Sequence, residues 1–285
     1  MGHLMPSPAL FDAFPALADL RRQQGRIGHR SLGQFPTPIE RVGVLGSPGS
    51  GCELWVKRED LAGSLYGGNK VRKLEFLLSE QSLQGPGRRL LTVGAYASNH
   101  VLATGIYGRL IGVPVEAVLY PQPITPWVKT AFMVGLGAGI RLHICRSYLG
   151  VPWALLKAWR HGPAPYFLPP GGANPLGTLG WWSGGLEIAA QVASGMAPPF
   201  DAVYVPLGSG ATSAGLLLGL GTAAAELVAV RVVPWPVASA LGVKRLASRT
   251  RALLTRLCGQ APPPFPQARL RVEGRFLGQG YGYLT

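Results

Sequence analysis

Three short segments of the chain carry side chains whose types and spacing could do chemistry. In the first, Gly67-Gly68-Asn69-Lys70, a lysine follows two glycines and an asparagine and does not lie on a charged helix face. A lysine partly buried there would have a lowered pKa, and its neutral amine could form a Schiff base with a carbonyl compound. Burial statistics alone favour an exposed lysine. The segment therefore raises a catalytic hypothesis that needs support from elsewhere.

The second segment is a glycine-rich loop that follows an apolar strand. Its members are Gly208, Ser209, Gly210, Ala211 and Thr212. Glycines let the backbone turn tightly, so that N–H groups at the start of the next helix point outward together and can hold a phosphate. No Gly-Lys-Ser/Thr follows, and Ser213 stands where a dinucleotide fingerprint has its third glycine. By itself the loop is equally consistent with a tight strand-to-helix turn.

The third segment is Ser98-Asn99-His100, at the carboxyl end of a predicted strand and the start of a predicted helix. Ligands of α/β proteins usually bind at this end of the strands. A Ser-Asn pair is also an ordinary helix cap, so this segment alone decides nothing.

Predicted strands and helices alternate along most of the chain and place these segments at their junctions. The predicted strands cover residues 53–57, 90–93, 115–120, 141–144, 166–169, 202–206 and, as the final strand, 226–232. The predicted helices cover residues 71–78, 100–111, 126–136, 152–160, a stretch ending at 191 and one starting at 213. An N-terminal arm with one short amphipathic helix precedes them, and a Pro262-Pro263-Pro264 break follows them. This alternation predicts an α/β fold with mostly parallel, doubly wound sheets.

Length and composition agree with such a fold. The 285 residues are 47% hydrophobic and only 14% charged, with 40 glycines and 26 prolines, which suits one large or two modest domains with many short loops. Three widely spaced cysteines indicate neither a disulfide framework nor a zinc site, and no histidine has metal-ligand spacing, so we expect no metal and a cytoplasmic location. The N-terminus lacks the pattern of a secretory signal.

Two further features could indicate other functions. The apolar window over residues 211–230 is long enough to span a bilayer, but its Gly- and Ala-rich sequence after a strand favours a buried helix and no membrane contact. The net charge is +14, and half of it lies between Lys244 and Arg275. No aromatic residues are interleaved there to stack bases, so we interpret this segment as a solvated basic face without specific nucleic-acid binding.

Taken together, the order of the three segments resembles the fold-type II pyridoxal-phosphate enzymes. More narrowly, residues 67–77 (Gly-Gly-Asn-Lys-Val-Arg-Lys-Leu-Glu-Phe-Leu) and 92–100 (Thr-Val-Gly-Ala-Tyr-Ala-Ser-Asn-His) resemble the branch containing 1-aminocyclopropane-1-carboxylate deaminase and D-cysteine desulfhydrase. The resemblance runs from about Thr37 to the last residue, and the lysine motif is highly specific to this branch.

The resemblance implies roles around the cofactor, pyridoxal 5′-phosphate. Lys70 would hold it as a Schiff base and later move the substrate's α-proton or its equivalent. Asn69 and Lys73 would lie close to it, Lys73 near the phosphate, and the amides of residues 208–212 would hold that phosphate. Asn99 would hydrogen-bond the cofactor's ring oxygen.

The resemblance also implies a set of substrate-side residues. Ser98 and the neighbouring amides, with Asn99 and His100, would bind the carboxylate of a small amino acid, and Ser98 is also a candidate proton-transfer group. Tyr281, within Gly280-Tyr281-Gly282, matches a tyrosine that lies near the substrate in the family. The catalytic set implied by the resemblance is therefore Lys70, Ser98 and Tyr281.

For the fold, the resemblance implies a three-layer α/β architecture like that of the tryptophan synthase β chain. We expect a large cofactor-binding domain from residues 1–72 and 166–285, a small α/β domain from 73–165, and a homodimer. The implied activity is that of D-cysteine desulfhydrase, which converts D-cysteine to pyruvate, ammonia and sulfide. Deamination of 1-aminocyclopropane-1-carboxylate is the alternative within the family.

The chain departs from the family pattern in two places. Relatives continue into a segment resembling Asp-Pro-Val-Tyr-Thr/Glu-Gly-Lys, with a second tyrosine and a partner for the pyridine nitrogen, whereas this sequence stops at Thr285. We therefore expect compromised catalysis, and a truncated, non-catalytic cofactor- or polyanion-binding protein is the alternative from another class. In addition, Ala95-Tyr96-Ala97 stands where the two named enzymes more often carry a glutamine or similar residue just before Ser-Asn, which affects the substrate prediction only.

Overall fold

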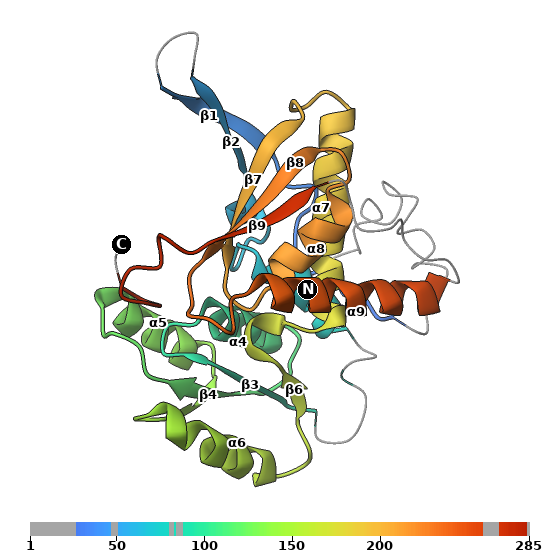
Figure 1. Cartoon of the computed structure of the whole chain (residues 1–285). Helices are drawn as coiled ribbons and strands as arrows, with labels where there is room; N and C mark the ends of the chain where they lie inside the picture. Colours follow the sequence, from blue (N-terminus) through green and yellow to red (C-terminus); the bar gives the residue numbers. More distant parts are fainter. Residues whose placement is uncertain (1–26, 47–50, 80–82, 84–87, 259–267, 284–285) are drawn as a thin grey trace.

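The computed structural model describes residues 27–46, 51–79, 83, 88–258 and 268–283. The predicted N-terminal helix and the Pro262–Pro264 break lie outside these residues. The described residues form two parallel β-sheets that lie one above the other in Figure 1. Helices that belong to each sheet meet in the space between the two sheets. The α/β class and the parallel sheets predicted from the sequence are confirmed.

The first sheet has four parallel strands in the order β5-β4-β3-β6. The strands are β3 (Leu90–Ala95), β4 (Val115–Tyr120), β5 (Arg141–Ile144) and β6 (Tyr166–Leu168). Helix α4 (Asn99–Leu110) and helix α5 (Pro126–Gly137) contribute to the core on one face, and α6 (Val151–Arg160), after the 3-10 turn η3 (Tyr148–Gly150), covers the other. Because β3 is buried along its whole length, its sequence is apolar except for Thr92 and does not alternate.

The second sheet has three parallel strands in the order β7-β8-β9, which are β7 (Phe200–Leu207), β8 (Ala224–Arg231) and β9 (Arg269–Glu273). Its apolar side chains pack with those of α7 (Pro175–Ala193), α8 (Ala211–Gly219) and α9 (Ala240–Cys258) in one core. The prediction that residues 226–232 form the final strand was wrong. Strand β9 follows within the basic segment, where Arg271 pairs with Glu226 of β8 at 3.0 Å.

An antiparallel hairpin, β1 (Ile39–Leu45) with β2 (Cys52–Lys57), projects beside the second sheet (Figure 1). The sequence analysis identified β2 but not β1. A 3-10 turn, η1 (Glu59–Leu61), follows the hairpin and leads toward α3 (Lys70–Leu77), which is buried along nearly its whole length. Another turn, η4 (Pro170–Gly172), connects β6 to α7.

The first part of the basic segment lies in the amphipathic helix α9. This helix buries Val243, Leu246 and Leu254 and exposes the basic residues Lys244, Arg245, Arg249 and Arg256. The apolar window over residues 211–230 divides into α8 and β8, and within the described residues no helix is both long and apolar enough to cross a membrane.

Candidate active site

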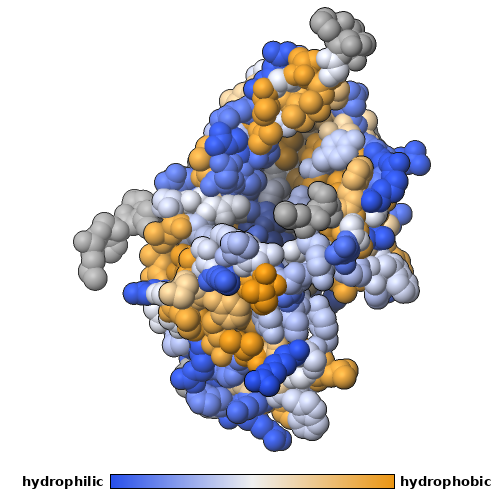
Figure 2. Space-filling view, turned by 90° about the vertical axis from the view of Figure 1, so that its left-hand side faces the viewer, coloured by the Kyte–Doolittle hydropathy of each residue, from blue (hydrophilic) through white to orange (hydrophobic). Residues whose placement is uncertain are grey.

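A cavity of about 560 Å³ lies between the two sheets, where the surface is hollowed between the upper and lower parts of the molecule (Figure 2). The carboxyl ends of β3 and β7 both lead into it. The predicted site residues that line it are Lys70, Asn69, Lys73, Ser98, Asn99, His100, Gly208, Ser209, Gly210, Thr212 and Tyr281. Ala211 is the exception, because it is fully buried at the start of α8 and is not part of the lining. The cavity thus brings together residues from four separate segments of the sequence.

Lys70 is the first residue of α3, and its amine projects at the cavity. Burial lowers the pKa of this amine to about 8. At pH 7.5 about a quarter of such amines are neutral, compared with about one in a thousand for an ordinary lysine. Lys70 is therefore suited to act as a nucleophile toward a carbonyl group.

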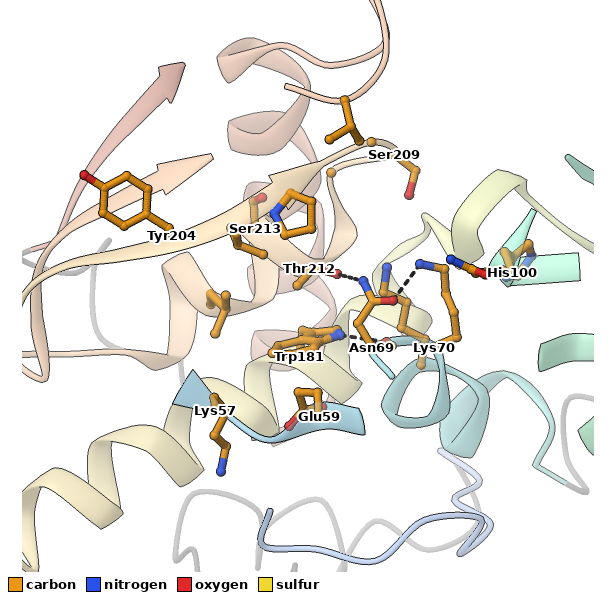
Figure 3. Close-up of a pocket in the computed structure, with 18 of the residues that line it drawn as sticks. Lys57, Glu59, Asn69, Lys70, His100, Trp181, Tyr204, Ser209, Thr212 and Ser213 are labelled. Atoms are coloured by element: carbon orange, nitrogen blue, oxygen red, sulfur yellow. Dashed lines mark hydrogen bonds between the residues drawn. The ribbon is translucent and has the colours of Figure 1, made fainter. Parts of the chain in front are cut away.

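Asn69 connects the lysine to the glycine loop. Its Oδ1 accepts a hydrogen bond from Lys70 Nζ at 2.7 Å, and its Nδ2 donates to Thr212 Oγ1 at 3.1 Å (Figure 3). The amide is thereby fixed in one orientation, with its oxygen toward the lysine and its nitrogen toward α8. One residue couples the amine to the loop that was predicted to bind phosphate.

The loop turns sharply into α8 because Gly210 has a φ of +87°, a conformation that side chains disfavour. The first N–H groups of a helix have no partner within it and favour an anion. Ser213, on the first turn of α8, adds a buried hydroxyl that lines the cavity and has no hydrogen-bond partner among the described residues. These unpartnered donors form a cradle that fits a phosphate group.

Lys73 places a second buried amine near this cradle. Its Nζ donates to the carbonyl of Gly171 at 3.2 Å. Gly171 in turn lies against Ser209, because a Cβ added to this glycine would collide with the Ser209 hydroxyl. Burial, and then the nearby charge of Lys70, hold the pKa of Lys73 well below its usual value. A dianionic ligand would compensate both lysines.

Ser98 and Asn99 begin α4 at the opposite side of the cavity. Ser98 caps the helix, with its Oγ accepting from the amide of Val101 at 3.4 Å. Asn99 Oδ1 accepts a hydrogen bond from the hydroxyl of Tyr66 at 2.9 Å. The helix cap and the predicted ligand contact are therefore compatible, since both residues still line the cavity.

His100 is buried, and its Nε2 lies 3.0 Å from Thr92 Oγ1, which donates its proton to the carbonyl of Leu168 at 2.9 Å. The histidine is thus the donor to Thr92. Burial, together with the charges of Lys70 and Lys73, lowers the pKa of His100 to about 3. It is a neutral hydrogen-bonding group in the wall of the cavity.

Tyr281 reaches the cavity from the C-terminal turn, and burial raises the pKa of its hydroxyl. It remains a proton donor at neutral pH. Burial, and then the electrostatic effect of the nearby Tyr281, also raise the pKa of Tyr66 and of Tyr120. Three tyrosines therefore lie close together.

The sequence analysis missed several residues of the lining. Those with polar or aromatic side chains are Trp55, Lys57, Glu59, Tyr120, Trp181, Tyr204 and Ser213. None belongs to a recognisable motif, and Trp181 lies in a helix with apolar residues on all sides, so its pattern gave no signal. Among the described residues, no group of three or more His, Cys, Asp or Glu side chains could hold a metal ion.

Beside the cavity, Arg72 of α3 joins a buried ionic cluster. Its guanidinium donates to Glu59 at 2.8 and 2.7 Å and to Glu187 at 3.0 and 2.9 Å, and Lys57 also pairs with Glu187. Burial opposes the charge on Arg72, but the two carboxylates outweigh it and raise its pKa. Because Glu59 is already paired with Arg72, it does not pair with Lys70 or Lys73. The two lysines therefore remain available to an anion in the cavity.

Comparisons with known proteins agree with this site. The sequence profile of the family described as "Pyridoxal-phosphate dependent enzyme" matches residues 30–256. The D-cysteine desulfhydrase of Yersinia pestis is 36% identical over 71% of this chain and 66% of its own length. The bifunctional D-cysteine desulfhydrase/1-aminocyclopropane-1-carboxylate deaminase, mitochondrial, of Arabidopsis thaliana is 34% identical over 72% of this chain and 55% of its own length.

The chain therefore spans about half to two thirds of the length of these relatives. A solved structure, that of an ACC deaminase homologue, superposes with a TM-score of 0.67 at 26% identity, covering 98% of this chain and 80% of the other. The chain belongs to the pyridoxal-phosphate-dependent enzymes of fold type II, in the family of the 1-aminocyclopropane-1-carboxylate deaminases and D-cysteine desulfhydrases.

Proposed function

We propose that this chain is a pyridoxal-phosphate-dependent lyase of the D-cysteine desulfhydrase type and that Lys70 carries the cofactor. The observation that carries the proposal is the position of the Lys70 amine. The amine lies in the cavity, and burial lowers its pKa. Asn69 connects the amine to the glycine loop at the start of α8.

The residues present fit the cofactor. The amides of residues 208–212, together with Ser213 Oγ, would hold its phosphate, and Lys73 would balance part of the phosphate charge. Lys70 would form the covalent link. When bound, the cofactor supplies an electron sink for the bonds at the substrate's α-carbon.

The remaining chemistry falls to side chains of the chain itself. Ser98 and the α4 amides would orient the substrate carboxylate, since a helix N-terminus favours an anion. The neutral Lys70 amine would accept the α-proton and return it. Tyr281, whose hydroxyl stays protonated at neutral pH, would donate a proton on the substrate side.

For the substrate we favour D-cysteine, which with one water would give pyruvate, ammonia and hydrogen sulfide. The names of the relatives from Yersinia pestis and Arabidopsis thaliana both include this activity. The alternative is 1-aminocyclopropane-1-carboxylate, which with one water would give 2-oxobutanoate and ammonia. It is supported by the Arabidopsis thaliana relative and by the homologous solved structure.

An assay of 2-oxo acid release separates these possibilities. The purified protein, supplied with pyridoxal phosphate, is incubated with D-cysteine, L-cysteine or 1-aminocyclopropane-1-carboxylate, and Lys70→Ala serves as the blank. We expect Lys70-dependent pyruvate from D-cysteine at the highest kcat/KM. Higher kcat/KM with 1-aminocyclopropane-1-carboxylate would favour the deaminase. If no substrate turns over while the cofactor still binds, the non-catalytic cofactor-binding alternative would be favoured.

We also propose the domain division at residues 72/73 and 165/166, a cytoplasmic location and a homodimer. Strands β3, β4 and β5 lie within residues 73–165, which supports the division, whereas β6 (Tyr166–Leu168) pairs with β3 from beyond the second boundary. Limited proteolysis tests the boundaries, and sedimentation velocity tests the dimer.

A further inference from the structure

Trp181 of α7 contacts both parts of the site. It is 4% exposed and lines the cavity, and its Nε1 donates to the backbone carbonyl of Asn69 at 2.9 Å (Figure 3). Asn69 is the residue that receives the Lys70 amine and donates to Thr212. The indole N–H therefore holds the backbone of the one residue that couples the lysine to the cradle.

Arg72, three residues after Asn69, holds the first turn of α3 and contacts the Trp181 ring. Its guanidinium carbon lies 5.6 Å from the centre of the Trp181 ring and 4.0 Å from that of Phe35, with Glu59 and Glu187 closing the cluster. The indole ring is thus held in place by a charged group that is itself fully paired. The indole N–H that donates to Asn69 therefore belongs to a ring with a fixed position.

Glycines bring the backbone of α7 into direct contact with the backbones of α3 and α8 on either side of Trp181. A Cβ at Gly180 would collide with the carbonyl of Arg72 on α3, and a Cβ at Gly215 of α8 would lie 2.5 Å from the backbone of Trp181. Helices packed this closely transmit a displacement instead of absorbing it. The distance between Lys70 and the cradle on α8 is therefore set through the position of Trp181.

We propose that Trp181 is a positioning residue, whose indole N–H sets the Lys70 amine at the distance from the phosphate cradle that the cofactor requires. This inference rests on the proposed function. A phosphate held in the cradle presents the aldehyde of its own molecule to the amine, and such proximity is lost when the two parts are misplaced by about 1 Å. Trp181 acts through Asn69 and does not react itself.

The test compares pyridoxal phosphate with pyridoxal, which lacks the phosphate. The ratio of their second-order rate constants for Schiff-base formation, followed by absorption, measures how much the cradle assists Lys70. Trp181→Phe keeps the ring and removes the N–H. Trp182→Phe is the matched control, because Trp182 is its neighbour on α7, is 5% exposed and is not part of the cavity lining.

We expect the ratio to fall about tenfold in Trp181→Phe, the effect of losing one hydrogen bond, and to stay unchanged in Trp182→Phe. An equal loss of thermal stability in both variants with an unchanged ratio in both would overturn the inference. If the wild type forms no Schiff base with pyridoxal phosphate, the proposed function fails and the inference fails with it.

A second variant tests the same path from the side of α8. Thr212→Val removes the hydrogen bond between the Asn69 side chain and α8, and it leaves α7 unchanged. We expect the same fall in the ratio. In the double variant the two effects should be less than additive, because both act through Asn69, whereas full additivity would contradict a shared path.

Discussion

The side-chain amide of Asn69 donates a hydrogen bond to the hydroxyl of Thr212 at 3.1 Å, across 143 positions of the sequence. Asn69 directly precedes α3 and Thr212 lies in the first turn of α8, so the bond joins the starts of two helices. Lys70 and the loop that we propose to hold the phosphate are adjacent in space through this contact. The predictions below concern this junction and the structures that support it.

The pH dependence of Lys70 reactivity follows from its buried amine. Burial lowers the pKa to about 8, so the neutral, nucleophilic form increases as the pH rises through this value. The rate of Schiff-base formation by the cofactor-free protein should therefore rise with a midpoint near 8 and then level off. Stopped-flow absorption between about pH 6 and 10 measures it. A midpoint at the usual lysine value would show that the amine is not buried in solution.

Removing Arg72 should strongly destabilise the fold. Arg72→Met leaves the buried Glu187, 1% exposed, and Glu59 without their main partner, which we expect to cost about 3–5 kcal/mol of unfolding free energy. Urea denaturation measures the loss. The matched control is Arg58→Met, since Arg58 also pairs with two carboxylates but at the surface, and its loss should have little effect. Equal effects would mean that the buried cluster does not support the fold.

His100 should make the stability pH-dependent. Its pKa is about 3 in the folded protein and near 6.5 when unfolded, so between these values the unfolded state binds the extra proton. The stability supplied by the neutral imidazole is complete above about pH 6.5 and is lost as the pH falls. From pH 7 to pH 5 the wild type should lose about 2 kcal/mol more than His100→Gln. Parallel losses in both proteins would contradict a buried, neutral histidine.

Gly171 should be required for the phosphate cradle. It has a φ of +64°, and a Cβ there would collide with the Ser209 hydroxyl. Gly171→Ala should cost about 1–2 kcal/mol and also weaken pyridoxal phosphate binding, because Ser209 must move. Gly221→Ala is the control, with a φ of +55° and no neighbour within 4 Å of the added Cβ. A fluorescence titration measures the affinity for pyridoxal phosphate. Equal affinities of the two variants would show that Gly171 does not support the cradle.

The sequence predicted most of the first sheet and 11 of the 26 residues that line the cavity. Strand 141–144 was placed at its observed bounds, and Lys70, Ser98 and Thr212 meet as expected, because these residues lie at strand-to-helix junctions with strong local signals. Strand β9 was missed although Arg269-Leu-Arg-Val-Glu273 alternates charged and apolar residues, because its arginines were interpreted as part of one solvated basic face. Its pairing with β8 joins distant segments and cannot be inferred from this local pattern.

Trp181 and Arg72 show the same limit within the site. Trp181 lies in a helix with apolar residues on all sides, and Arg72 follows the lysine motif as one more basic residue. Their roles depend on contacts with Asn69 and with Glu187, which is 115 positions from Arg72. Composition and periodicity describe neighbours along the chain and do not report such contacts.

The central claim is that Lys70 carries the cofactor, and Lys73 is the alternative, because it lines the same cavity and also has a lowered pKa. The most direct measurement is the visible absorption of the wild type, Lys70→Ala and Lys73→Ala with pyridoxal phosphate, followed by borohydride reduction and mass mapping of the modified peptide. We predict a Schiff-base band in the wild type, its loss in Lys70→Ala, and its retention with weaker affinity in Lys73→Ala, with the label on Lys70. A band that persists in Lys70→Ala, or a label on Lys73, would contradict this account.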